Sequence, residues 1–387
     1  MFARNDKISK RQQKRMLVLD VFSLSCLIIP YIAVNSAGAG GIATVLIGTV
    51  LAMLYAGILY ICARQFIDEK KKRINFMAYS KQNVGSFFAG VIGVLYLVKL
   101  FLLLTFSASL FAQVIGKTLL IETSVNVVIA VLLLVSAYGA MHGIEKRARL
   151  TEILYILVMV PLILYLILGI PKIEFTNLTT GAVNSNFPKT GIIWGSLFIL
   201  LTFCALDGII FTHFHVKYTE EKRYFTPVFV ALTILGVADL LIYLVTVGIL
   251  GVGEAGSKLW SSVTIMQIIE IPGEFVRRQD KIMLAFWMLS IFNILTYCFF
   301  YMVQITKDYI GQCFIKDFEK YSKANKYIVL IYGILAFGLA STMTDIEVQF
   351  IQFGKYLLCI GVPQSIIIPL ILIGVSKIRR GKIADEK

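Results

Sequence analysis

The sequence predicts an all-α integral membrane protein with about ten transmembrane helices. Of its 387 residues, 58% are hydrophobic and 16% are charged, whereas a soluble domain is roughly half apolar and about a quarter charged. The apolar residues gather in long runs, separated by short polar segments that hold nearly all of the charge. A bilayer core of about 30 Å takes roughly 20 residues of helix. Because lipid offers the backbone no hydrogen bonds, each run is expected to cross as a helix.

The predicted spans form a single transmembrane domain, residues 17–376, between basic tails at 1–16 and 377–387. Hydropathy places the spans, in chain order, at approximately 17–35, 42–65, 85–113, 123–141, 150–170, 190–215, 226–251, 282–305, 327–343 and 352–376. The ninth span is short, because polar residues begin at Ser341 and continue to Asp345.

Basic residues orient the predicted bundle. One side holds 28 Lys and Arg residues, in segments 1–16, 64–81, 146–149, 217–223, 307–326 and 377–387. The opposite side holds seven, namely Lys117, Lys172, Lys189, Lys258, Arg277, Arg278 and Lys281. Since cytoplasmic loops carry the excess of positive charge, both termini are expected in the cytoplasm. The net charge of +14 is therefore mostly topogenic, and nucleic acid is not an expected partner.

Three ionisable residues fall deep inside predicted spans: Lys99, Asp207 and Asp239. A charge at mid-membrane costs roughly 2.5 kcal/mol or more, so such a residue usually faces a cavity or a partner. Their signs allow Lys99 to pair with one of the two aspartates. Two interpretations stay open, a structural buried ion pair and a proton-coupling group. Asp20 and Lys355 lie nearer the span ends and are interpreted as structural.

Two spans contain features that break helices. The first carries Ser23-Leu24-Ser25-Cys26 ahead of Pro30, which lacks a backbone N–H and frees a carbonyl. The sixth carries Thr202 to Gly208, with Asp207 beside a glycine that permits unwinding. If residues 17–170 and 190–376 are two halves of five spans, the halves are inverted and the broken spans are equivalent. Interrupted helices at equivalent positions point to a transporter-type binding site.

Other local patterns carry no chemistry. Gly251 to Gly256 spells a glycine-rich nucleotide motif, but it follows a membrane span and lacks the strand–turn–helix context. His213 and His215 point to different faces of a helix, and the six cysteines have no metal-like spacing. No catalytic set stands out. The sequence therefore predicts no enzyme activity, no cofactor and no metal site.

Several segments, taken in order, resemble one known family. They are Gly273 to Lys281 leading into Ala285-Phe286-Trp287, His142 to Ile153, Asn177-Leu178-Thr179, Thr246 to Gly251, and Ile368-Pro369-Leu370 ahead of a basic tail. The chain resembles the spore-germination permeases, which are the GerAB-type B subunits of germinant receptors. That family belongs to the amino acid–polyamine–organocation superfamily, and the resemblance covers essentially the whole chain.

The resemblance implies a LeuT-like fold of two inverted repeats with discontinuous first and sixth helices. It implies a pocket at these breaks for a small germinant, an amino acid above all, and A- and C-type partner subunits in a spore inner membrane. The residues expected to line this pocket are Ser23, Leu24, Ser25, Cys26, Phe203, Cys204, Asp207 and Gly208. The ligand carboxylate is expected at freed amides near Ser23 to Cys26, and its ammonium near Asp207. The alternatives are a proton-coupled amino acid transporter, using Asp207 or Asp239, and a structural scaffold.

Overall fold

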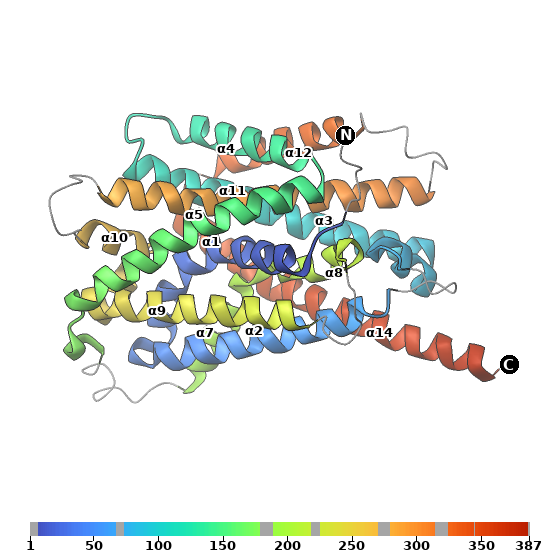
Figure 1. The fold of residues 1–387 in the computed structure, drawn as a ribbon, viewed down its shortest axis with the longest axis horizontal. Helices are drawn as coiled ribbons and strands as arrows, with labels where there is room; N and C mark the ends of the chain where they lie inside the picture. Colours follow the sequence, from blue (N-terminus) through green and yellow to red (C-terminus); the bar gives the residue numbers. More distant parts are fainter. Residues whose placement is uncertain are drawn as a thin grey trace.

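The structure is a computed structural model that describes residues 7–66, 73–178, 189–217, 225–269, 279–313, 324–343 and 345–385. The described chain is almost entirely helical, and several of its long helices, such as α2, α9 and α11, run roughly along one direction (Figure 1). Eight of these helices are long and apolar enough to cross a membrane, and one bent helix pair provides a ninth crossing. The predicted all-α, multi-pass membrane architecture is confirmed.

The first five predicted spans each overlap a helix. These helices are α1 (Lys10–Ala37), α2 (Gly41–Ala63), α3 (Phe76–Thr118), α4 (Val125–Ala140) and α5 (Ile144–Gly169), with short 3-10 turns η1 (Gly38–Gly40) and η2 (Ile170–Lys172). α3 is longer than predicted, because it begins at an Asn75 cap and continues through a break at Gly85, where φ is 83°. α4 has only 16 residues and is the shortest of the apolar helices in this half.

The second half begins with the bent pair. α7 (Lys189–Thr202) meets η3 (Cys204–Asp207), α8 (Gly208–Thr212) and η4 (His213–His215). The helices that follow are α9 (Thr226–Ser257), α10 (Ser261–Ile268), α11 (Gln279–Cys313), α12 (Ala324–Thr342), α13 (Ile346–Tyr356), the π-turn η7 (Leu357–Gly361) and α14 (Val362–Asp385). The polar residues after the ninth span have a structural reason, since the Asp345 side chain accepts from the Glu347 and Val348 amides and caps α13.

α1 is the central helix of the bundle. It packs against α9, α7, α11 and α5, and Figure 1 shows it between α9 and α11. In its most apolar 18-residue stretch 94% of the window is buried, whereas the share is 17% in the corresponding stretch of α12. On the outer helices, large apolar side chains such as Leu54, Leu134 and Ile334 are exposed, which is the pattern expected of a surface that faces lipid.

The predicted discontinuity of the first span is corrected by the structure, because α1 is helical from Lys10 to Ala37, through Ser23 to Cys26 and Pro30. Pro30 has no N–H to give to the carbonyl four residues earlier, which belongs to Cys26. The Ser262 hydroxyl, from α10, donates to this Cys26 oxygen at 2.8 Å. A side chain from another helix therefore satisfies the freed carbonyl, as neighbouring helices do for prolines in membranes, and the helix continues.

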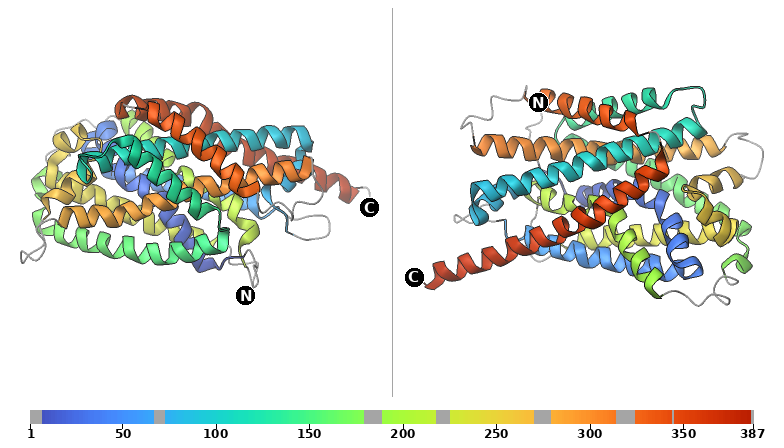
Figure 2. Two further views of the ribbon diagram at one scale, coloured as in Figure 1. Left: turned by 90° about the horizontal axis from the view of Figure 1, so that it is seen from above. Right: turned by 180° about the vertical axis from the view of Figure 1, so that it is seen from behind.

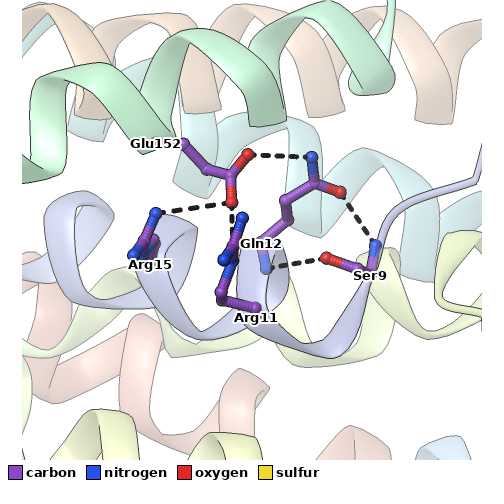
Figure 3. Close-up of polar contacts among 5 residues, drawn as sticks. All are labelled: Ser9, Arg11, Gln12, Arg15 and Glu152. Carbon is purple, nitrogen blue, oxygen red and sulfur yellow. Dashed lines mark hydrogen bonds and ion pairs between the residues drawn. The ribbon is translucent and has the colours of Figure 1, made fainter.

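The N-terminal segment is anchored at one end of the bundle. The Ile8 amide donates to the His215 carbonyl and the Lys217 amide donates to the Ile8 carbonyl, each at 2.8 Å. Ser9 then caps α1 through a reciprocal pair of bonds with Gln12. Figure 3 shows three side chains of the first helical turns around Glu152 of α5, namely Arg11, Gln12 and Arg15.

Further contacts link the basic segments at this end. The Arg73 guanidinium donates to the Val216 carbonyl at 3.2 Å, and Arg379 donates to the carbonyl of Gln82. Figure 2 shows α14 extending past the other helices toward the C-terminus. Described residues of segments predicted to share one side of the membrane, namely Ile8, Arg73, Lys217 and Arg379, thus make their contacts at this end.

Candidate functional site

The site is built around the break between α7 and α8. The two parts of this span meet at an angle of 51°. At the break, the Phe203 amide donates to the Leu200 carbonyl and the Leu206 amide donates to the Phe203 carbonyl, at 3.1 and 3.0 Å. These are three-residue steps, so tight 3-10 turns replace the α-helical ladder. The predicted discontinuity of the sixth span is therefore present, and it begins at Phe203.

Gly208 follows the break at a close approach between helices. A Cβ atom built on Gly208 would lie 2.9 Å from Cε2 of Tyr297 on α11. Only a glycine allows the start of α8 to pack this closely against that ring. The structure thus gives Gly208 a packing role beside the break. Its predicted role as a ligand-binding residue stays a prediction.

A buried ion pair joins this break to α3. The Lys99 Nζ lies 2.5 Å from Asp207 Oδ2, and both side chains are at most 5% exposed. Tyr55 of α2 donates to the other Asp207 oxygen. Lys99 also donates to the Ser365 hydroxyl of α14 at 2.5 Å. Four elements therefore meet at one charge-neutral cluster. The sequence indicated that Lys99 could pair with one of two aspartates, and the structure brings it to Asp207.

Both oxygens of Asp207 thus have donors from the protein itself. The ammonium group expected beside Asp207 is provided by Lys99, rather than left for a ligand. Tyr55 and Ser365 were not found from the sequence, because one tyrosine and one serine in apolar helices carry no signal without a known partner. Only the mutual geometry of α2 and α14 identifies them.

Two small cavities flank the break. The first, of about 30 Å³, is lined by the polar groups Tyr55, Lys99, Cys204 and Ser365 and by the apolar residues Leu200, Leu201, Phe203, Leu357, Gly361 and Ile366. Lys99 therefore lines this cavity and also contacts Asp207, which does not line it. Phe203 and Cys204, both predicted as ligand-binding residues, line this cavity.

The second cavity lies against α1. It is also about 30 Å³ and is lined almost entirely by apolar groups, namely Leu24, Ile28, Ile32, Phe106, Phe198, Leu201, Thr202, Phe350, Phe353, Gly354 and Leu357. Leu201 and Leu357 line both cavities and so lie between them. Each cavity has room for a few water molecules at most, while ligand pockets are typically 300–1,000 Å³. A solute would enter only if these walls move.

The remaining predicted residues of α1 lie away from the two cavities, apart from Leu24. The Ser23 hydroxyl is buried and has no partner within the described part of the chain. Ser25 contacts the Phe22 carbonyl at 3.4 Å and Asp239 Oδ1 of α9 at 3.1 Å. Because α1 is helical here, the free amides expected to meet a ligand carboxylate at Ser23 to Cys26 are absent from this structure.

A second buried ion pair lies on the other side of α1. Arg147 of α5 pairs with Asp20 of α1, and Asn293 of α11 donates to the same Asp20 oxygen at 3.1 Å. The guanidinium also stacks near the Tyr297 and Tyr301 rings, at 5.6 and 5.8 Å. Arg147 was counted with the basic loop residues, but the structure buries it. Its segment, His142 to Ile153, is one of those that carry the family resemblance.

The strongest part of that resemblance begins at Gly273, and its residues up to Arg278 lie outside the described part of the chain. The glycine-rich run from Gly251 to Gly256 lies within α9, where Gly251 has a φ of 73° that interrupts the helix. It has no strand before it, so the structure agrees that it is not a nucleotide-binding turn.

Known proteins share the sequence pattern of this chain. The sequence model of the family described as "Spore germination protein" matches residues 7–346. The chain is similar to Spore germination protein A2 of Bacillus subtilis (strain 168), with 22% identity over 325 residues, which are 84% of each protein. It is also similar to Spore germination protein YndE of the same organism, with 21% identity over 294 residues, 76% of this chain and 78% of that protein.

Among solved structures, the chain is similar to a Na⁺-coupled sialic acid symporter in a substrate-bound, outward-open state. The TM-score is 0.70 and the sequence identity is 14%, over 92% of this chain and 77% of that chain. At this identity the likeness shows the fold alone. The predicted LeuT-like fold is therefore confirmed.

Proposed function

Because the chain belongs to the spore germination protein family, we propose that it is the permease-like membrane subunit of a germinant receptor and binds a small nutrient, an amino acid, between α1 and the α7–α8 break. The observation that carries this proposal is the position of Lys99. Its buried ammonium lines a cavity at the broken span, and an apolar cavity lies alongside.

The chemistry of Lys99 suits a carboxylate. An ammonium group has three N–H donors, and Lys99 directs two of them to Asp207 and Ser365. The third is left for a ligand oxygen. Because Lys99 and Asp207 together are neutral, a net charge brought by the ligand would be uncompensated and costly in this buried place. A zwitterion adds none, which favours an amino acid over a simple organic acid.

The second cavity supports an apolar side chain on that amino acid. Its walls include Leu24 and Ile28 of α1, Phe106 of α3 and Phe353 of α13. Burial of a hydrocarbon side chain among such groups is favourable by roughly 25 cal/mol per Å². Moving Leu201 and Leu357 would join the two cavities, so the carboxylate and the side chain of one ligand would occupy the two parts.

Binding of labelled leucine and phenylalanine to the full-length protein in lipid nanodiscs tests this proposal. The informative variant is Lys99→Met/Asp207→Asn, which removes the pair without leaving an unpaired charge. We expect it to weaken binding at least tenfold. The matched control is Lys258→Met/Glu254→Gln, which removes an exposed pair at the end of α9 and should bind as the wild type does. Equal binding by the wild type and the buried-pair variant would overturn the proposal.

A proton-coupled amino acid transporter is the competing function, since a symporter, coupled there to Na⁺, has the same fold. Uptake into proteoliposomes separates the two. Saturable binding without accumulation supports a receptor subunit, and accumulation driven by a pH gradient supports a transporter. In spores, germination in response to the ligand should be lost on deletion of the chain.

Partners and membrane placement extend the same proposal. The proposed partners are A- and C-type receptor subunits, and the proposed location is the bacterial cytoplasmic membrane or the spore inner membrane. The contacts of Ile8, Arg73 and Arg379 at one end of the bundle support a common side for both termini. By the positive-inside rule that side is the cytoplasm. Co-purification of the A and C subunits with the tagged chain tests the assembly.

A further inference from the structure

Among the described residues, three aspartates are buried inside the bundle, and two of them pair with a cation. Asp207 pairs with Lys99, and Asp20 pairs with Arg147. Asp239 of α9 is fully buried, and no Lys, Arg or His within the described part of the chain pairs with it. One of its oxygens contacts Ser25, and the other, Oδ2, has no partner among the described residues. Asp239 therefore differs from the other two in lacking a built-in positive charge.

The helices packed against α9 place no partner charge at Asp239, because the buried charges of α1 and α5, Asp20 and Arg147, pair with each other. α2 and α10 contain no Asp, Glu, Lys, Arg or His at all. The titratable groups in the neighbourhood are the Cys26 thiol on α1 and, beyond it, the Tyr165 phenol on α5. Lys172 of η2 directs its ammonium to the Ile268 carbonyl instead. An ionised Asp239 would thus be an unpaired buried charge, which proteins avoid by neutralising the group.

The hydrogen bonds around Ser25 fit the neutral acid. Its hydroxyl oxygen lies 3.1 Å from Asp239 Oδ1 and 3.4 Å from the Phe22 carbonyl oxygen. A serine has one proton to donate, so beside an ionised Asp239 it would either donate to that carboxylate or keep its bond to the Phe22 carbonyl, which already accepts within α1. If Asp239 carries the proton, the acid donates to Ser25 and Ser25 donates to Phe22. Each of the two hydroxyl donors, on Asp239 and on Ser25, then has one acceptor.

A metal cation has few ligands to find here. Transporters of this general architecture bind Na⁺ through unwound backbone carbonyls. In this chain α1 stays helical from Ser23 to Cys26, so its carbonyls are engaged within the helix. The one that Pro30 frees, on Cys26, already accepts from Ser262. One serine hydroxyl beside a carboxylate does not make a cage of oxygens for Na⁺.

We propose that Asp239 is a proton-binding site, which holds a proton in the closed bundle described here and exchanges it when α1 and α9 separate. This inference goes beyond the proposed ligand site at the α7–α8 break. It rests on contacts of α1 and α9 alone, so it stands or falls independently of amino acid binding.

Infrared difference spectroscopy of the full-length protein in nanodiscs tests this assignment. The wild type at neutral pH should show the carbonyl stretch of a protonated carboxylic acid, lost at high pH. Asp239→Asn should abolish this band, while the control Glu254→Gln, which changes an exposed carboxylate of the same helix, should retain it. A band that persists in Asp239→Asn would overturn the proposal.

Two further measurements test the same proposal independently. Ser25→Ala removes the acceptor of the proposed proton and should shift the band without abolishing it, so an unshifted band would contradict the assignment even if Asp239→Asn failed to fold. The melting temperature should be the same in NaCl and in choline chloride. A rise in NaCl that is seen in the wild type and lost in Asp239→Asn would assign the place to Na⁺ and overturn the proton site.

Discussion

The ammonium of Lys99 lies 2.5 Å from the carboxylate of Asp207, although 108 positions separate these residues in the chain. Asp207 ends the 3-10 turn at the broken span, and Lys99 lies within α3. The pair therefore ties the break to a neighbouring helix, and it holds a charged group at the wall of the adjoining cavity.

Removing one partner of this pair should destabilise the fold more than removing both. Lys99→Met alone leaves Asp207 as a buried charge without its cation, at a cost of about 3–5 kcal/mol. In Lys99→Met/Asp207→Asn no charge is left unpaired, so the loss of stability should be smaller than in either single variant. Thermal unfolding of the four proteins in one detergent measures this coupling. Additive losses would show that the two groups do not form a pair.

Arg147 and Arg149, two residues apart on α5, should respond very differently to substitution by methionine. Arg147 is buried with Asp20, so Arg147→Met should lower the free energy of unfolding by about 3–5 kcal/mol. Arg149 forms an exposed pair with Glu145, so Arg149→Met should cost less than about 1 kcal/mol. Melting temperatures of the two variants test this, and equal losses would contradict the burial of Arg147.

The Ser262 hydroxyl should matter only while Pro30 is present. Ser262→Ala leaves the Cys26 carbonyl buried without a donor, which should cost about 1–3 kcal/mol. Pro30→Ala restores a backbone N–H for the Cys26 carbonyl. In that background, Ser262→Ala should lower the free energy of unfolding much less. Ser261 is the matched control, because its buried hydroxyl has no partner among the described residues. Chemical denaturation of the single and double variants measures the coupling, and an equal effect in both backgrounds would refute it.

The N-terminal cluster around Glu152 should contribute little to stability at high salt. Glu152 faces Arg11, Gln12 and Arg15 in Figure 3, and the arginines are partly exposed. Glu152→Gln should lower stability by about 1 kcal/mol or less at low ionic strength, and less at high ionic strength because salt screens exposed charges. Melting temperatures across a salt series test this. A loss that does not change with salt would mean that packing, not charge, dominates.

The helical architecture followed from the sequence because long apolar runs have one stable form in lipid. The break at Phe203 to Gly208 could also be predicted, since a glycine and an acid interrupt an otherwise apolar run. The break at Pro30 could not be judged in the same way. A proline frees a carbonyl, but whether the helix opens there depends on a donor from elsewhere, here Ser262.

The site shows the same limit. Lys99 and Asp207 were found because charge is rare and costly in a membrane span. The choice between Asp207 and Asp239 as the partner of Lys99 needed the packing of α3 against the break. Tyr55 and Ser365 gave no signal, because hydroxyl groups are common in such helices. Arg147 was assigned to a loop since basic residues cluster at span ends, and only its contact with Asp20 shows that it is buried.

The proposed solute binds between α1 and the break, where Leu201 separates the two cavities. Direct binding of labelled leucine to Leu201→Trp and Leu201→Ala in nanodiscs tests it, with folding checked by melting temperature. We predict that tryptophan fills both cavities and abolishes binding, while alanine joins them and preserves or strengthens it. The lipid-facing control Leu134→Trp should bind as the wild type does. Unchanged binding in Leu201→Trp would contradict the account.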